Sequence, residues 1–214
     1  MEYWDKRYLA EGKIWGDLPS KSANHALMLF KKQKINSILV PGSGYGRNTK
    51  LFSVNGFKVV GIEISKIAYD IALNFDPKTT FFQGSFLDTD LFDEKYDAIY
   101  CFNLLHLFND ANRRLFIKKC INLLQNPGYL YFTAFSEKEK SFGKGRQIEL
   151  YTFENKPGRP IHYFTNKDLK EHFKQFNILK TGQLKEKENH GILGPHIHIL
   201  RYIFASNISS VKAL

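Results

Sequence analysis

The sequence contains only two cysteines, Cys101 and Cys120, and no hydrophobic run approaches the roughly 20 residues that a membrane-spanning helix requires. Its first residues, MEYWDKRYLAEG, are charged and lack the apolar core of a secretory signal peptide. One cysteine falls on a predicted strand and the other on a predicted helix face, so we expect buried free thiols rather than a disulfide. These absences predict a protein of the reducing cytoplasm that does not insert into a membrane.

Acidic residues are also fewer than basic ones. The chain has 21 aspartates and glutamates and 31 lysines and arginines, which gives a formal net charge of +10. The basic residues are spread along the chain without a dense run. This favours a soluble, lysine-rich surface over a groove for a nucleic-acid backbone, with attraction of anionic substrates or nucleic acid as the alternative. Hydrophobic residues make up 43% and aromatic residues 15% of the 214 positions, which predicts a globular α/β chain of one domain.

A glycine-rich turn organises the chain. The apolar run Ile38–Val40 stops at Pro41, and glycines follow at every second position, 42, 44 and 46. A helical pattern then begins, so the stretch predicts a buried parallel strand, a tight turn and a helix. Glycines allow positive φ and leave no Cβ between the backbone and a ligand, while the start of the helix offers free N–H groups.

A second strand follows, GFKVVGIE, and it ends in the carboxylate of Glu63, 63 − 42 = 21 positions after the first glycine. An acidic residue at this distance lies at the tip of the neighbouring strand, where it can accept hydrogen bonds from ribose hydroxyls. The order of strand, glycines, helix, strand and carboxylate predicts a nucleoside-bearing cofactor. The spacing is G-x-G-x-G with Arg47 in place of a third dinucleotide glycine, which disfavours a nicotinamide oxidoreductase, and no G-x-x-x-x-G-K-[ST] run is present.

At this point the chain resembles the class I S-adenosylmethionine-dependent methyltransferases. The pieces VPGSGYGRN, VVGIEIS and YDAIYCFNLLHLF match the first, second and fourth strand regions of that family in order. Within the family, the chain is most similar to the tellurite-resistance and thiopurine methyltransferase group, through WDKRY, GRN and HGILGPHIH. The resemblance implies a Rossmann-like, seven-stranded and mostly parallel sheet with helices on both faces. Its strand order would be 3-2-1-4-5-7-6, with the last strand antiparallel.

The resemblance also implies S-adenosylmethionine as the cofactor. The family usually has an acidic residue after the third strand for the adenine amino group, whereas this chain has Gly84-Ser85-Phe86. Ser85 or a backbone group could take that contact, and Phe86 could either stack on the ring or pack inside its loop. The residues that we predict to bind the cofactor are Trp15, Pro41, Gly42, Ser43, Gly44, Gly46, Arg47, Asn48, Glu63, Ile64, Ser85, Phe86, Asn103 and Leu104.

Two segments are candidate covers for the site. Residues 1–34 carry Tyr3, Trp4 and Tyr8 beside Trp15 and form either an amphipathic helix on the sheet edge or a flap over the cofactor, where aromatic faces favour the sulfonium cation. Residues 136–160 form a polar, glycine-containing insertion, which we expect to be a long loop. It could close over the substrate, and a disordered surface loop is the alternative. We expect both segments to order when the cofactor binds.

Histidines supply the candidate chemistry. Asn103, Leu104 and His106 follow the fourth strand at its tip, where a parallel sheet opens toward its ligand. His106 and His162 are candidate general bases, with a structural, hydrogen-bonded role as the alternative. His196 and His198 share one face of a late strand and, with His190, could meet an anionic acceptor, as could Tyr3, Trp4 and Tyr8. Since no cysteine or carboxylate stands at ligand spacing, we expect no structural zinc.

The sequence therefore predicts a methyltransferase for a small, soft or anionic acceptor such as a thiol or a metalloid oxyanion. A soft nucleophile needs alignment and exclusion of water rather than a strong base. A nucleic-acid methyltransferase and a non-catalytic S-adenosylmethionine-binding protein are the alternatives. The acceptor's identity and the oligomeric state do not follow from the sequence.

Overall fold

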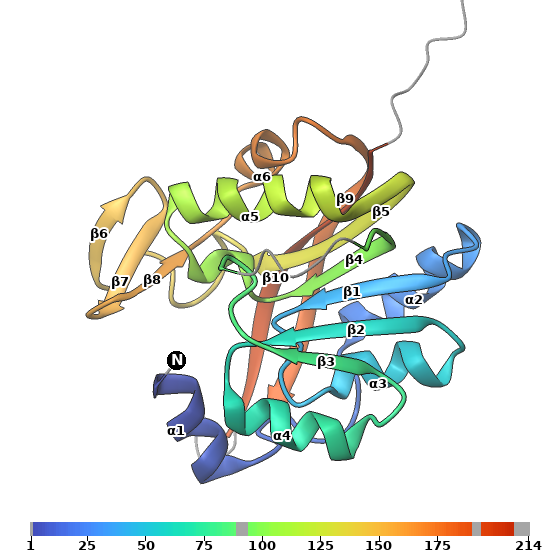
Figure 1. The fold of residues 1–214 in the computed structure, drawn as a ribbon. Helices are drawn as coiled ribbons and strands as arrows, with labels where there is room; N and C mark the ends of the chain where they lie inside the picture. The colour runs from blue at the N-terminus through green and yellow to red at the C-terminus, as the bar shows by residue number, and fades with distance from the viewer. Residues whose placement is uncertain (1, 89–93, 190–193, 208–214) are drawn as a thin grey trace, which may run out of the picture. The chain divides into compact units, whose positions relative to one another are not determined.

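The computed structural model describes residues 2–88, 94–189 and 194–207 (Figure 1). The chain divides into two compact units, of which the first comprises Met1–Phe92 and Lys185–His198, and the second comprises Asp93–Leu184 and Ile199–Leu214. The prediction of a single domain stays a prediction. Within the described ranges, every helix is too short or too polar to cross a membrane.

One seven-stranded sheet runs through the fold in the order β3-β2-β1-β4-β5-β10-β9. Strands β1, β2 and β3 pair in parallel, β4 pairs in parallel with β5, and β10 is antiparallel to β5. Counting only these strands gives 3-2-1-4-5-7-6, so the predicted fold class and strand order are confirmed. The strands are β1 (Ser37–Pro41), β2 (Lys58–Glu63), β3 (Thr80–Gln83), β4 (Tyr96–Phe102), β5 (Leu124–Phe135), β9 (Asn177–Asn189) and β10 (Pro195–Ser206).

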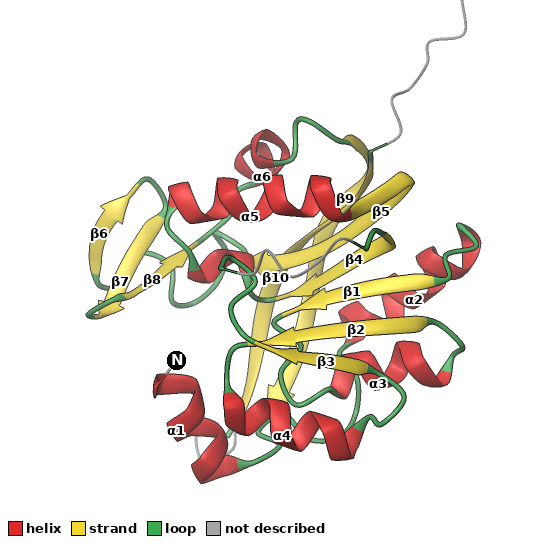
Figure 2. Cartoon of the chain, in the orientation of Figure 1, coloured by secondary structure: helices red, strands yellow, loops and turns green. Residues whose placement is uncertain are grey.

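Two of the helices of the first unit (Figure 2) begin at a serine that caps them. The Ser20 hydroxyl accepts from the Ala23 amide at 3.0 Å, and the Ser65 hydroxyl accepts from the Ala68 amide at 3.2 Å. Each hydroxyl satisfies one of the N–H groups that a helix start leaves without a partner. The helices are α1 (Glu2–Glu11), α2 (Lys21–Lys32), α3 (Arg47–Val54) and α4 (Lys66–Phe75).

A buried carboxylate joins α3 to the end of α4. Asp76 is 1% exposed and accepts hydrogen bonds from the hydroxyls of Thr49 at 2.7 Å, Ser53 at 2.6 Å and Thr79 at 2.6 Å. A buried charge is tolerated only when its lone pairs are satisfied, and three hydroxyl donors achieve this here. Asp76 thereby fixes the helix that leaves the glycine turn.

Replacing Asp76 by alanine should lower the free energy of unfolding by about 1–3 kcal/mol, because three buried hydroxyls lose their shared acceptor. Urea denaturation followed by circular dichroism measures the change. Asp70→Ala is the matched control, since Asp70 lies on α4 with a half-exposed side chain paired to Lys66. The control should change the unfolding free energy by less than about 0.5 kcal/mol, and equal losses in both variants would contradict the assignment.

The second unit contains two α-helices, a 3-10 turn and a small second sheet. The predicted loop 136–160 is wrong as secondary structure, since this stretch contains most of an antiparallel sheet in the order β6-β7-β8. The elements are η1 (Leu105–Leu107), α5 (Asp110–Leu123), α6 (Asn166–His172), β6 (Arg146–Glu149), β7 (Thr152–Lys156) and β8 (Arg159–His162).

The boundary between α5 and β5 also differs from the prediction. The sequence predicts a helix over 111–125, with its apolar residues on one face and Asn126-Pro127-Gly128 as its stop, but the helix ends at Leu123 and β5 begins at Leu124. Pairing with β4 explains the difference, because Leu124 lies opposite Tyr96 and Tyr129 lies opposite Ala98. The register shift between these pairs takes up the intervening residues as an irregularity of the strand.

Candidate active site

The glycine turn has the backbone that its sequence predicts. Gly42, Gly44 and Gly46 adopt φ values of +65°, +57° and +91°, a region that other residues enter only with strain. At Gly44, an added Cβ would lie 3.2 Å from the hydroxyl of Tyr8. The turn therefore requires glycine for its conformation and, at Gly44, also for the close approach of a neighbouring side chain.

Glu63 bridges the glycine turn and the start of α4. One carboxylate oxygen accepts from the Gly44 amide at 2.8 Å, and the other accepts from the Ser65 amide at 2.8 Å. Glu63 is 6% exposed, and burial raises the pKa of its carboxyl above the ordinary value. Each oxygen keeps a second acceptor position, so the bridge still leaves room for hydroxyl donors from a ligand.

The N-terminal segment covers this turn with aromatic rings. Tyr8 is 5% exposed, and its ring centroid lies 6.1 Å from that of Tyr45 in the turn. Trp15 stacks on Tyr45 at 6.2 Å with an interplanar angle of 12°, and Trp4 lies 6.4 Å from Trp15. Tyr3, more exposed, meets Trp4 edge-on at 5.1 Å. Within this segment, α1 packs on α4 and on the glycine turn. The role of residues 1–34 as a flap stays a prediction.

Arg47 and Asn48, predicted to bind the cofactor, both direct their side chains to protein groups. Arg47 is 8% exposed, forms an ion pair with Glu188 of β9, and donates to the Trp15 carbonyl at 3.4 Å. Its guanidinium also lies 5.6 Å from the centroid of the Trp15 ring. The Asn48 side-chain oxygen accepts from the Ser20 amide at 3.0 Å. Their contact with the cofactor stays a prediction, whereas the ion pair of Arg47 with Glu188 was not predictable because nothing in the sequence marks Glu188 as a partner.

In the turn after β3, Ser85 and Phe86 contact other residues of the protein. The Ser85 hydroxyl accepts from the Leu87 amide at 3.2 Å, and Phe86 is 6% exposed. Its burial favours packing inside the loop over stacking on a ligand. Ile64 is half-buried, and its carbonyl accepts from the Gln83 side chain at 3.1 Å. Pro41 and Ser43 are buried at the end of β1.

In the second unit, Asn103 and Leu104 follow β4. Asn103 has φ of +50°, its amide donates to the Thr133 carbonyl at 3.1 Å, and its side-chain oxygen accepts from the Thr133 hydroxyl at 3.1 Å. Leu104 is half-buried at the start of η1. His106 is 2% exposed and stacks on Phe135 with the ring centroids 4.0 Å apart. A residue held at positive φ on a strand tip is often part of a functional site.

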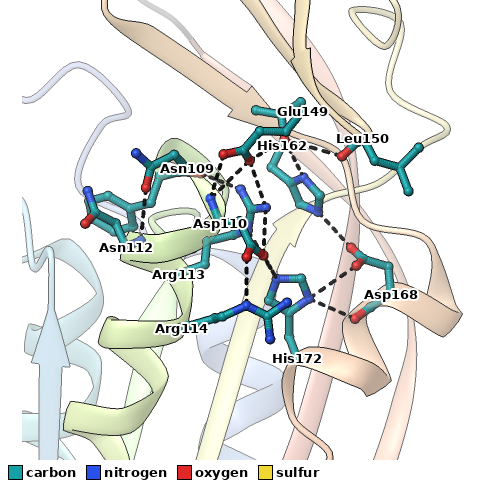
Figure 3. Close-up of polar contacts among 12 residues, drawn as sticks. Asn109, Asp110, Asn112, Arg113, Arg114, Glu149, Leu150, His162, Asp168 and His172 are labelled. Carbon is teal, nitrogen blue, oxygen red and sulfur yellow. Dashed lines mark hydrogen bonds and ion pairs between the residues drawn. The ribbon is translucent and has the colours of Figure 1, made fainter.

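His162 belongs to a closed polar network of the second unit (Figure 3). Its Nε2 lies 2.7 Å from the Asp168 carboxylate, and its Nδ1 lies 2.8 Å from the Thr152 hydroxyl. The network continues through His172, which accepts from the buried Arg113 guanidinium at 3.2 Å, and returns through Glu149. Both ring nitrogens of His162 are thus committed to the protein, which favours the structural alternative over a general base.

Burial lowers the pKa of His162 below its ordinary value, although Asp168 opposes the shift. Burial alone would raise the pKa of Asp168, but hydrogen bonds from His162 and His172 hold it well below its usual range. Both shifts act in the same direction. The unfolded chain binds protons at these sites more readily than the folded protein, so acid must destabilise the fold.

The free energy of unfolding should therefore fall as the pH drops from about 6.5, where an unfolded histidine begins to charge, and should fall further below about 4 as Asp168 protonates. His162→Gln keeps an amide donor and acceptor and should flatten the upper part of this dependence. Urea denaturation between pH 7.5 and pH 3.5 tests it. His196→Gln, with an exposed side chain, is the control. A curve for His162→Gln parallel to that of the unaltered protein would contradict the assignment.

His196 and His198 lie side by side with ring centroids 4.7 Å apart, as the spacing on one strand face predicts. His198 is 7% exposed, whereas His196 is exposed. Their contact with an acceptor stays a prediction. His190 lies outside the described residues.

Comparisons with known proteins agree with this geometry. Residues 38–128 match the model of a family described as a methyltransferase domain. "Probable thiol methyltransferase 2" of Arabidopsis thaliana is 29% identical over 159 residues, which make up 71% of this chain and 69% of that protein. The matched methyltransferase domain and this relative support S-adenosylmethionine-dependent methyltransferase activity in this chain, which is similar to the class I enzymes.

Solved methyltransferase structures share the fold. A methyltransferase of Methanosarcina mazei, described as S-adenosylmethionine-dependent, has a TM-score of 0.72 and 20% identity over 85% of this chain and 97% of its own. The 1,6-didemethyltoxoflavin-N1-methyltransferase of Burkholderia thailandensis, solved with S-adenosylhomocysteine, has a TM-score of 0.66 and 18% identity over 88% and 79%.

The residues of this methyltransferase fit its cofactor. The positive-φ glycines carry no side chain at the end of β1, and the start of α3, where no side chain caps the helix, suits polar ligand atoms. The Glu63 carboxylate is an acceptor at the tip of β2, where ribose hydroxyls are bound in folds of this kind. We therefore propose that this turn and Glu63 bind the cofactor, as the sequence predicts.

Glu63→Ala should weaken S-adenosylmethionine binding by about 1–3 kcal/mol, because the cofactor loses a charged acceptor. Isothermal titration calorimetry measures the affinity, and thermal unfolding should be recorded in parallel because the Gly44 and Ser65 amides also lose a partner. Glu171→Ala removes a more exposed carboxylate of α6 and should leave affinity unchanged. Wild-type affinity in a folded Glu63→Ala protein would exclude Glu63 from the site.

Proposed function

We propose that this methyltransferase acts on a small, soft or anionic acceptor, with thiols as the foremost class. The observation that carries the proposal is that both candidate bases, His106 and His162, are buried and packed or bonded inside the protein. His162 has both nitrogens bonded inside the protein, and burial lowers its pKa. His106 is 2% exposed and stacked on Phe135. Neither side chain is presented as a base for an alcohol or amine, whereas a thiol ionises without one, since its ordinary pKa is about 8.5.

The remaining catalytic requirement is alignment. S-adenosylmethionine supplies a methyl group that its sulfonium already activates for in-line displacement. The protein's residues then have to hold the cofactor by the glycine turn and Glu63, orient the acceptor, and exclude water. The aromatic rings of Tyr3, Trp4 and Tyr8 suit exclusion of water and attraction of a cation.

Two further features support this acceptor class. The similar Arabidopsis thaliana protein is named a thiol methyltransferase. The formal net charge of +10 attracts anions, including thiolates and metalloid oxyanions, and the paired rings of His196 and His198 would suit the same ligands. Cys101 and Cys120 are both buried free thiols, which supports a location in a reducing cytoplasm.

The pH dependence of turnover tests the proposal. With S-adenosylmethionine saturating, kcat/KM should rise with pH up to the pKa of the acceptor thiol. It should shift to lower pH when a more acidic thiol replaces a less acidic one. A panel of an aliphatic thiol, an aromatic thiol, hydrosulfide and selenite covers the class. A profile that keeps one pKa for every acceptor, and that His106→Gln or His162→Gln abolishes, would show a protein base instead.

The same assay should include RNA as a competing acceptor, because the positive charge also suits a phosphate backbone. We expect no methyl transfer to RNA and only weak binding that disappears at physiological salt. Salt-resistant RNA binding accompanied by RNA methylation would replace the proposed acceptor class.

A further inference from the structure

The side chain of Asp5, on α1, holds the first turn of α4. Its Oδ1 accepts from the Ser65 hydroxyl at 2.6 Å and from the Ile67 amide at 3.3 Å. The Ser65 hydroxyl in turn accepts from the Ala68 amide, so its single proton is directed to Asp5. The hydrogen bond from Ser65 lowers the pKa of Asp5, which is consistent with a charged acceptor at this position.

Ser65 connects Asp5 to the cofactor-binding carboxylate. Its amide donates to Glu63 at 2.8 Å, and the other oxygen of Glu63 accepts from Gly44. The order of contacts is therefore Asp5, Ser65, Glu63 and the glycine turn. Asp5 is separated from the ribose-binding group by a single residue that both carboxylates share.

The same helix reaches the other end of this chain of contacts. Tyr8, almost one turn after Asp5, places its hydroxyl beside Gly44 and its ring against Tyr45. Helix α1 thus contacts both groups that Glu63 joins. With only 10 residues, several of them charged, α1 is too short to be stable without such contacts.

We propose that Asp5 is a positioning residue of the cofactor site. It fastens α1 to the first turn of α4 and, through Ser65, sets the position in which Glu63 accepts the ribose. Because α1 and the cofactor engage the same two groups, docking of α1 and binding of S-adenosylmethionine are coupled, and each stabilises the other. This inference rests on the assigned cofactor site and is independent of the acceptor.

Three variants measured by calorimetry with S-adenosylmethionine alone test the proposal. Asp5→Ala should weaken binding about tenfold, as expected for the loss of one charge-assisted hydrogen bond. Asp5→Asn retains an oxygen acceptor for Ser65 and should bind within about threefold of the unaltered protein. Asp17→Ala, in the same segment but with a 61% exposed side chain, should bind normally. Normal affinity in Asp5→Ala, or an equal loss in Asp5→Asn, would overturn the proposal.

Hydrogen exchange without cofactor separates positioning from general stability. In Asp5→Ala, amides of α1 should exchange faster while those of β1 and β2 keep their protection, and added S-adenosylmethionine should restore protection in α1. Faster exchange throughout the first unit would show a merely structural role.

A double-mutant cycle gives a second line of proof. Ser65→Ala should lose as much affinity as Asp5→Ala, and the double variant should lose no more than either. Additive losses would show that Asp5 does not act through Ser65. None of these measurements needs a methyl acceptor, so an incorrect acceptor class would leave them unchanged.

Discussion

The glycine turn and the start of α4 depend on the hydrogen bonds that the Glu63 carboxylate accepts. This carboxylate lies at the end of β2, is almost fully buried, and binds one backbone amide of the glycine turn and one of the turn into α4. A buried carboxylate with two amide donors holds its surroundings firmly, because each donor would lose a charged partner if the other moved. The glycine turn and the turn into α4 are therefore held by one carboxylate, which is also the acceptor that we predict for a nucleoside.

Carboxylates from distant segments recur at helix starts throughout this fold. Glu186 of β9 accepts from the Lys21 and Ser22 amides at the start of α2. Glu149 of β6 accepts from the Asp110 amide at the start of α5, beside the buried Arg113. A helix start offers N–H groups that lack an intrahelical partner and the positive end of the helix dipole, so each carboxylate joins a strand to the start of a helix.

The core of the first unit follows from local signals. Apolar runs mark β1 and β2, glycines mark the turn, and a serine, a residue typical of helix starts, caps α4. The small sheet was missed because its strands are only four or five residues long and largely polar, so no apolar alternation distinguishes them from a loop. The ion pair of Arg47 was missed for another reason, since its partner Glu188 is 141 positions away and single-sequence patterns carry no such pairing.

The candidate histidines show the same limit. The sequence alone does not distinguish a histidine that faces a substrate from one that is bonded inside the protein. Only the fold shows that Thr152 and Asp168 contact the two ring nitrogens of His162. Conversely, the place of Glu63 at the end of β2 was predictable, because it depends on a fixed distance along the chain from the first glycine. The spacing of residues within one strand–turn–helix motif can be read from a sequence, whereas contacts between residues far apart along the chain cannot.

The chain has two tryptophans, Trp4 and Trp15. Both lie in the N-terminal segment, and their ring centroids are 6.4 Å apart. The guanidinium groups of Arg7 and Arg47 lie 5.5 and 5.6 Å from the centroid of the Trp15 ring. The emission of the protein excited at the red edge of its absorption band thus originates entirely beside the glycine turn. The molecule contains its own optical probe of that region, and no dye or labelled residue is needed to follow it.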